Sequence, residues 1–182
     1  ETVVVPSAAG ASAAGPGGLD RIDLVVVAVL LFLVGRTWCA ANDKWTAASW
    51  AVPTAYLEPD KNDVIHALAM VKAAGEGEFV PLAWKHVSHL GAPDGANWND
   101  WPLVEELLIT WYAILARVFG LFAGFNAATL IAHLSAVAAF YVVARWENCG
   151  RHWAFVAALA FGLAPFIFAQ SPFHITTEYV WH

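Results

Sequence analysis

The side chains best suited to chemistry in this sequence are the carboxylates and histidines between residues 42 and 100. Asp63 and His66 lie three positions apart, so on a helix both side chains would face one cleft. A carboxylate at a water–lipid boundary can act as a general base, and a nearby imidazole can orient it or bind phosphate. The plainer interpretation is that Asp63 occupies the first turn of a helix, where acids are favourable, and that His66 is simply solvated.

Two further groups extend this candidate site. The carboxylate oxygens of Asp100 could help to bind a divalent cation, although Asp100 could equally cap a helix that begins at Pro102. His86 and His89 have an HxxH spacing, but no Cys or carboxylate pattern supports it, so the metal signal is weak and its identity unknown. Residues 76–99, around this spacing, are punctuated by Gly and Pro and are predicted to be irregular.

A helix over residues 60–74 would position the candidate base. Pro59 precedes it, Asp60 can serve as its N-cap, and Gly75 can end it. Lys72 lies in its last turn and could contact a lipid phosphate.

The composition excludes an ordinary soluble domain. Hydrophobic residues make up 59% of the 182 residues and charged residues only 13%, which is too apolar for one core of this size. Three apolar blocks, 22–34, 127–144 and 153–169, approach the roughly 20 residues with which a helix crosses about 30 Å of hydrocarbon. A net charge of −6 without a basic patch argues against nucleic acid as a partner. The predicted partner is the lipid bilayer.

Residues 103–122 are long enough to span a membrane but carry three charges, Glu105, Glu106 and Arg117. Burying them would cost several kcal/mol. We therefore expect this segment to lie along the outer membrane surface, with the side chains of Trp111 and Tyr112 at headgroup depth. Arg145 and Arg151 then fall on the same side as the N-terminal tail, as the positive-inside rule favours. If the segment crosses instead, both arginines fall outside.

The resulting fold class is an all-α integral membrane protein with about three transmembrane helices and a large outer loop that contains interfacial helices. The predicted order is a disordered cytoplasmic tail (1–21), a first transmembrane helix (22–41), an extracytoplasmic loop (42–125), a second transmembrane helix (126–144), a cytoplasmic turn (145–152), a third transmembrane helix (153–170) and an extracytoplasmic segment, expected to be truncated (171–182).

Two features inside or beside the spans have plain interpretations. His133 lies within the second predicted span, where an ionisable residue is by default a functional candidate. We favour a hydrogen bond to a neighbouring helix, through Ser135 or Thr129. Cys39 and Cys149 would lie on opposite membrane faces, so they fit no disulfide.

Several sequence segments resemble the beginning of a class C membrane glycosyltransferase, in particular a bacterial multi-spanning subgroup of that fold. They are Asp63-Val-Ile-His66, His89-Leu-Gly-Ala-Pro-Asp-Gly95, Asn97-Trp-Asn-Asp-Trp-Pro102, Gly150-Arg151, Ala160-Phe-Gly-Leu-Ala-Pro165 and His174 followed by Tyr179-Val-Trp-His182. The resemblance covers roughly residue 56 to the end, and its motifs are moderately specific. A shared fold does not by itself establish a shared activity.

The resemblance implies transfer of a sugar from a polyprenyl-phosphate donor to a cell-envelope acceptor, on the extracytoplasmic side of the bacterial inner membrane. It places Asp63 as the base that deprotonates the acceptor. His174, on the next outer segment, could line the same cavity. Enzymes of this fold carry many more spanning helices. Further membrane helices from the rest of the protein or from another subunit are therefore expected partners, and a divalent cation is a candidate cofactor.

Two other classes of function remain open at this stage. The first is a non-catalytic membrane subunit, or a protein that handles lipid-linked glycans, which docks partners through its outer loop. The second is a pigment- or haem-binding subunit, which is the weakest because the sequence has neither a CxxCH motif nor a helical bis-His pattern.

Overall fold

The computed structural model describes residues 19–54, 64–80, 83–88, 95–97 and 106–166. The described part is mostly helical, and its elements in chain order are α1 (Arg21–Ala41), α2 (Ala47–Trp50), α3 (Val64–Glu76), β1 (Phe79–Val80), β2 (Trp84–Val87), β3 (Ala96–Asn97), α4 (Glu106–Phe119), α5 (Leu121–Trp146) and α6 (Arg151–Gly162). Two of these helices, α1 and α5, are long and apolar enough to cross a membrane. Three continuous spans are not confirmed, because α6 has only 12 residues.

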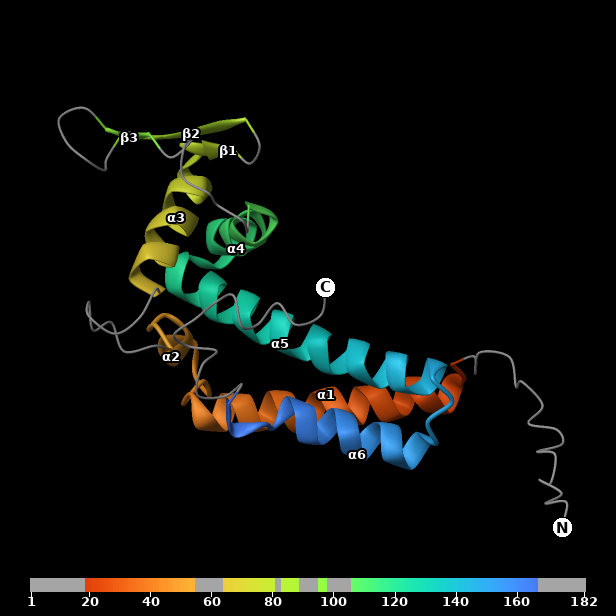
Figure 1. Cartoon of the computed structure of the whole chain (residues 1–182). Helices are drawn as coiled ribbons and strands as arrows, with labels where there is room; N and C mark the ends of the chain where they lie inside the picture. The colour runs from red at the N-terminus through yellow and green to blue at the C-terminus, as the bar shows by residue number, and fades with distance from the viewer. Residues whose placement is uncertain (1–18, 55–63, 81–82, 89–94, 98–105, 167–182) are drawn as a thin grey trace, which may run out of the picture.

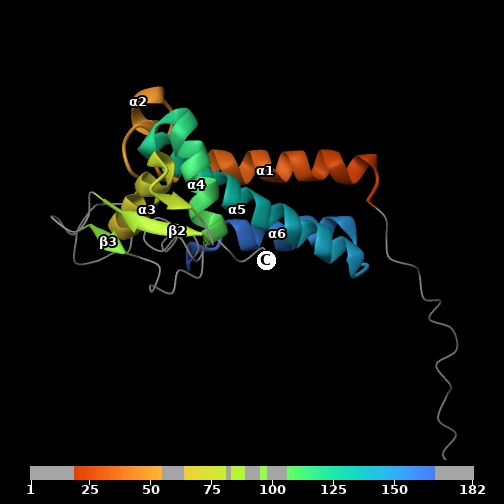
Figure 2. The same cartoon turned by 90° about the horizontal axis from the view of Figure 1, so that it is seen from above.

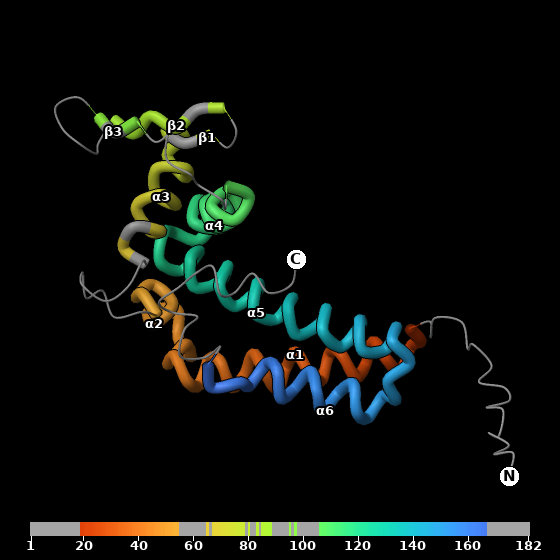
Figure 3. Tube along the Cα trace, viewed as in Figure 1, coloured from red at the N-terminus to blue at the C-terminus, as the bar shows by residue number. Residues whose placement is uncertain are grey.

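A bundle of α1, α5 and α6 forms the long part of the molecule, and α3, α4 and the strands lie at one end of it (Figures 1 and 3). The three bundle helices meet through a common apolar core, which contains Leu30, Val34, Val137, Tyr141, Ala154 and Ala158. Alanines on α6 let its backbone approach α1 and α5 closely, which is how helices associate when lipid surrounds them. We call the end that carries α3, α4 and the strands the layer end, and the opposite end the arginine end.

At the arginine end, an ion cluster joins the three bundle helices, each of which contributes residues to it. The buried Asp23 carboxylate of α1 accepts hydrogen bonds through Oδ1 from the hydroxyl of Tyr141 at 2.6 Å, from Nε of Arg145 at 3.0 Å and from Nε of Arg151 at 3.1 Å. Arg151 also donates to Asp20, the N-cap of α1, at 2.8 Å. A buried carboxylate is stable only when it is paired in this way. The cluster therefore fixes α1 against α5 and α6.

The segment predicted to lie along the membrane surface divides into two helices. It contains α4, which ends at Phe119, and the first two residues of α5, with Gly120 at φ 87° between them. Glycine readily adopts this positive φ, so the chain turns at Gly120 and a new helix starts directly after it. α5 therefore begins five positions before the predicted start at 126. Viewed end-on in Figure 1 and lengthwise in Figure 2, α4 runs across the bundle axis. This is the orientation expected of an in-plane helix.

The predicted end of the 60–74 helix at Gly75 is wrong. α3 continues through Gly75 and ends at Glu76, because the C-terminal stop is supplied by Gly77 at φ 88°. Gly77 donates its backbone N–H to the carbonyl of Ala74 at 3.2 Å, and Glu78 donates to that of Ala73 at 3.0 Å. These two bonds define a Schellman motif, in which the left-handed residue is the one after the C-cap.

The segment predicted to be irregular also contains a small sheet. β1, β2 and β3 form an antiparallel meander, with Phe79 opposite Lys85 and His86 opposite Asn97. Phe, Val and Trp in these short runs favour strands. Each strand has only two to four residues, which is too short for an alternating pattern to be recognised between so many Gly and Pro residues.

Gly124 should be the least replaceable glycine of the α4–α5 connection. A Cβ at this position would lie 2.4 Å from the backbone N and Cα of Ala116 on α4, and backbone cannot move aside as a side chain can. We expect Gly124→Ala to destabilise the protein by about 2–3 kcal/mol through overpacking. The measurement is unfolding of the purified protein in mixed micelles with increasing SDS.

Gly35→Ala on α1 is the matched control. Its Cβ would meet only the two Cδ atoms of Leu134, at 3.7 and 3.8 Å, which are ordinary contacts, and alanine favours the helix. Equal unfolding of both variants would contradict the close approach of α4 and α5.

Candidate functional site

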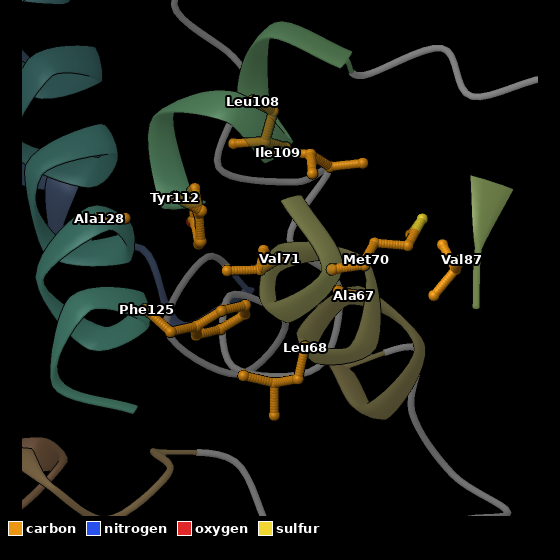
Figure 4. Close-up of a cluster of buried hydrophobic side chains, with 11 residues drawn as sticks. Ala67, Leu68, Met70, Val71, Val87, Leu108, Ile109, Tyr112, Phe125 and Ala128 are labelled. Carbon is orange, nitrogen blue, oxygen red and sulfur yellow. The ribbon is translucent and has the colours of Figure 1, made fainter. Parts of the chain in front are cut away.

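The layer end is built around one apolar core. α3, α4, β2 and the first turns of α5 contribute to it (Figure 4), and its buried residues are Ala67, Leu68, Met70, Val71, Ala73, Val87, Leu108, Ile109, Tyr112, Phe125 and Ala128. Because these side chains come from α3, α4 and α5 together, the core holds the start of α3 at a fixed place beside the bundle. That start is the described part closest in sequence to the predicted base.

Tyr112 belongs to this core, so its predicted place at headgroup depth is wrong. Its side chain is fully buried, packs edge-on against Phe125 with ring centroids 4.8 Å apart, and shares a hydrogen bond of 3.0 Å with Thr129. The helical period explains the error, because Tyr112 lies one turn from Leu108 and therefore on the buried face of α4. Trp111, on the neighbouring face, is exposed.

Most of the predicted site residues lie outside the described part of the chain. These are Asp63, Asp100, His89 and His174. His66 belongs to α3, but its side chain also lies outside the described part. The role predicted for each of them therefore stays a prediction. What the structure adds is the position of α3, whose first residue, Val64, directly follows the candidate base.

Lys72 is described, and its charge is already balanced. Its ammonium donates to Glu76, one turn further along α3, at 2.6 Å, and both side chains are about half exposed. A pair of this kind contributes little to stability. It reduces the case for Lys72 as the residue that contacts a lipid phosphate.

Two further polar pairs involve the sheet, one with α4 and one with the turn that follows α3. Lys85 of β2 forms an ion pair with Glu106 at the start of α4, and both side chains are mostly buried. Ser88 donates its hydroxyl to Glu78, which follows α3. Glu106 thus contacts protein and is largely shielded from solvent. The first pair fixes the sheet on α4, and the second joins the residues that flank β1 and β2.

A polar cluster at the layer end, which the sequence reasoning missed, attaches the loop after α1 to the start of α5. We call it the loop anchor; its centre is Asn126, which is buried. Asn126 Nδ2 donates to the carbonyls of Trp50 at 2.9 Å and Val52 at 2.8 Å, and Oδ1 accepts from the backbone N–H of Thr54 at 3.2 Å and its hydroxyl at 2.6 Å. One amide side chain therefore positions the last described residues before 55–63, the segment that carries the candidate base.

Lys44 completes the loop anchor. Its side chain is buried, and its ammonium donates to the carbonyls of Ser49 and Val52, each at 2.8 Å. Burial lowers the pKa of Lys44, while the nearby Asp43 acts in the opposite direction. Trp50 returns a hydrogen bond from its indole N–H to the carbonyl of Lys44 at 3.1 Å. The loop is thus folded by side chains that satisfy its own backbone.

A weak signal for the loop anchor existed in the sequence. Asn126 is a strongly polar residue in an apolar helix, and such a residue usually contacts another part of the protein. Its partners lie 72 to 76 positions earlier, and three of the four are backbone groups, which carry no residue-specific pattern. The residue could therefore have been flagged, but its partners could not have been named.

Among the described residues, no group of three His, Cys, Asp or Glu side chains could hold a metal ion. No protein-family model, curated protein or solved structure matches the chain. Function is therefore inferred from the geometry of the layer end and from the sequence motifs.

Removing the loop anchor should release the loop while the bundle stays folded. Asn126→Ala deletes four hydrogen bonds and removes this partner from the part-buried Trp50 carbonyl and Thr54 N–H, so we expect a loss of about 2–3 kcal/mol. Hydrogen exchange followed by mass spectrometry should show faster exchange in residues 44–54 and unchanged exchange in α6.

Ser135→Ala, at an exposed position on the same helix, is the control and should match the wild type. If Asn126→Ala leaves exchange in residues 44–54 unchanged, Asn126 does not hold the loop.

Proposed function

We propose that this chain acts in a membrane glycosyltransferase that transfers a sugar from a polyprenyl-phosphate donor to a cell-envelope acceptor on the extracytoplasmic side. The observation that carries the proposal is the layer end: α3, which begins directly after Asp63, is packed on a helix that crosses the end of an apolar bundle. This arrangement suits a carboxylate that works at a membrane surface. The resemblance to the class C fold supports the same chemistry.

In the proposed membrane placement, α1 and α5 span the bilayer and α6 enters it from the arginine end. α1 has 21 residues, about 31 Å at 1.5 Å per residue, which matches a hydrocarbon layer of about 30 Å. Arg145 and Arg151 at the arginine end favour the cytoplasmic side. The layer end is then extracytoplasmic.

The exposed face of α4 supports a place for this helix at the outer membrane surface. Its side chains Leu107, Trp111, Ile114 and Val118 are exposed, and their spacing of three and four positions places them in one stripe. α4 therefore carries apolar residues on the face away from the core as well. An in-plane helix at the headgroup boundary would bury such a stripe in lipid and keep Arg117 wet.

The proposed chemistry is a direct displacement. The acceptor hydroxyl oxygen attacks the anomeric carbon of the donor sugar while the bond from that carbon to the phosphate oxygen breaks. Polyprenyl phosphate leaves with the bonding electron pair, and the carboxylate of Asp63 takes the acceptor proton. The configuration at the sugar carbon inverts. For this role Asp63 must lie within hydrogen-bonding reach of the acceptor, which a fixed α3 would favour.

A second candidate function is a non-catalytic subunit that docks a partner through the layer end. Charge pairing favours this second function. Lys72 is neutralised by Glu76, and Lys85 is neutralised by Glu106. A surface of this kind is suited to a scaffold. The two functions differ in whether a single carboxylate is indispensable for sugar transfer.

Replacing the candidate base should abolish sugar transfer without affecting the fold. Asp63→Asn keeps the shape and the capping ability of the side chain but cannot take a proton. We expect transfer of radiolabelled sugar from the polyprenyl-phosphate donor, in membranes that contain the full protein, to fall by roughly 100-fold or more. Asp43→Asn, at an exposed loop position, should transfer at the wild-type rate. Wild-type turnover in Asp63→Asn would favour the docking subunit.

The stripe on α4 should contact lipid. Spin labels placed singly at positions 107, 114 and 118 in nanodiscs should be more accessible to oxygen, which concentrates in the hydrocarbon, than to a water-soluble nickel chelate. A label at Val80, exposed on β1, should show the opposite preference. Labels on α4 that behave like the one at Val80 would place the stripe in water.

A further inference from the structure

The helical conformation breaks directly after α6, and the cause can be read from the sequence. The helix ends at Gly162, Leu163 and Ala164 are not helical, and helical conformation resumes at Pro165 and Phe166. Pro165 has no N–H to give to the carbonyl of Phe161, and its ring disfavours helical conformation at Ala164. The Phe161 carbonyl instead accepts the N–H of Ala164 at 3.1 Å. Proline then suits the first position of the resumed helix.

His133 of α5 compensates for a second hydrogen bond that the break removes. In an unbroken helix the carbonyl of Gly162 would accept the N–H of Phe166. Here His133 Nε2 lies 2.9 Å from that carbonyl. A carbonyl oxygen can only accept, so Nε2 carries the proton and donates. The predicted hydrogen bond from His133 to a neighbouring helix is thus present, with a backbone partner on α6 in place of Ser135 or Thr129.

The break lies where the three bundle helices meet. A Cβ on Gly162 would lie 2.7 Å from Cγ2 of Val137 on α5 and 3.1 Å from Cγ2 of Val34 on α1. His133 itself is buried. α6 is therefore firmly packed up to its end at Gly162. The residues after the break are attached to this fixed helix end.

Two helix lengths place this helix end near the middle of the bilayer in the proposed placement. His133 precedes Arg145 by 12 positions and Gly162 follows Arg151 by 11, which correspond to about 18 Å and about 16 Å along the helices. Both are about half of a hydrocarbon thickness of 30 Å. Non-helical backbone at this depth needs partners from within the protein. An ionisable side chain that supplies one is a candidate for function.

We propose that Leu163 and Ala164 form a hinge directly after α6 at mid-membrane depth, and that His133 holds the hinge closed by its hydrogen bond to Gly162. His133 acts as a positioning residue for Pro165 and Phe166, which follow the break. The hinge requires that the bundle spans the bilayer, but it does not depend on sugar transfer. Failure of one proposal therefore leaves the other intact.

Distances between paired spin labels can test the hinge in the full chain, reconstituted in nanodiscs after Cys39 and Cys149 are replaced by Ala. One pair, at Val143 and Phe166, crosses the break, and the other, at Ile131 and Trp153, stays on its first side. All four positions are exposed. With His133 present, both pairs should give one narrow distance distribution. In His133→Leu, the Val143–Phe166 distribution should widen about twofold or more while the Ile131–Trp153 distribution stays narrow.

His133→Gln is the conservative variant, because its amide N–H can donate near the position of Nε2, and it should keep both distributions narrow. The proposal is overturned if His133→Leu leaves the Val143–Phe166 distribution narrow, or if it widens both distributions equally. Should His133→Leu fail to fold, Pro165→Ala decides. Restoring the N–H should let α6 continue, and the Val143–Phe166 distance should move to one new value. An unchanged distance in Pro165→Ala would also overturn the hinge.

Discussion

The fold depends on the need to satisfy polar groups inside an apolar helix. α5 contacts every other described helix, and the buried polar residues along it each bond a different element. Asn126 holds the loop after α1, Thr129 bonds Tyr112 of α4, His133 bonds the α6 backbone, and Tyr141 bonds Asp23 of α1. Where lipid surrounds the helices, apolar surface alone gives little reason to prefer one neighbour over another. These four contacts supply that preference and fix the rotation of α5.

Buried polar groups are paired at both ends of the bundle, but with different chemistry. At the arginine end, charged side chains from three helices neutralise one another around Asp23. At the layer end, the loop anchor works through one amide, one ammonium and several backbone carbonyls. Paired charges lock helices firmly because separating them leaves a buried charge without a partner. An amide that bonds backbone tolerates changes of loop sequence more easily, which suits the end at which we place the function.

The sequence allowed the helices to be predicted better than their contacts. Uninterrupted apolar residues placed α1 within one residue of its start, because span length is a local property. The division between α4 and α5 was missed, since Gly120 lies in a run that reads as continuously apolar. Partners of Asp23 and Asn126 could not be named, because they depend on how distant helices are rotated and on backbone atoms. The candidate site was identified only by type and spacing, and Asp63 lies outside the described residues.

The ion cluster also constrains how the chain can be assembled during synthesis. The three groups that hold Asp23 lie 118, 122 and 128 positions later in the chain. In the proposed membrane placement, α1 therefore reaches the membrane before any of these three groups has been made. Until they arrive, Asp23 is a carboxylate on an apolar helix, and its solvation favours a location at the water boundary. In this placement α1 takes its final depth only when α5 and α6 are in place, so α1 is synthesised earlier than α5 and α6 but is fixed only together with them.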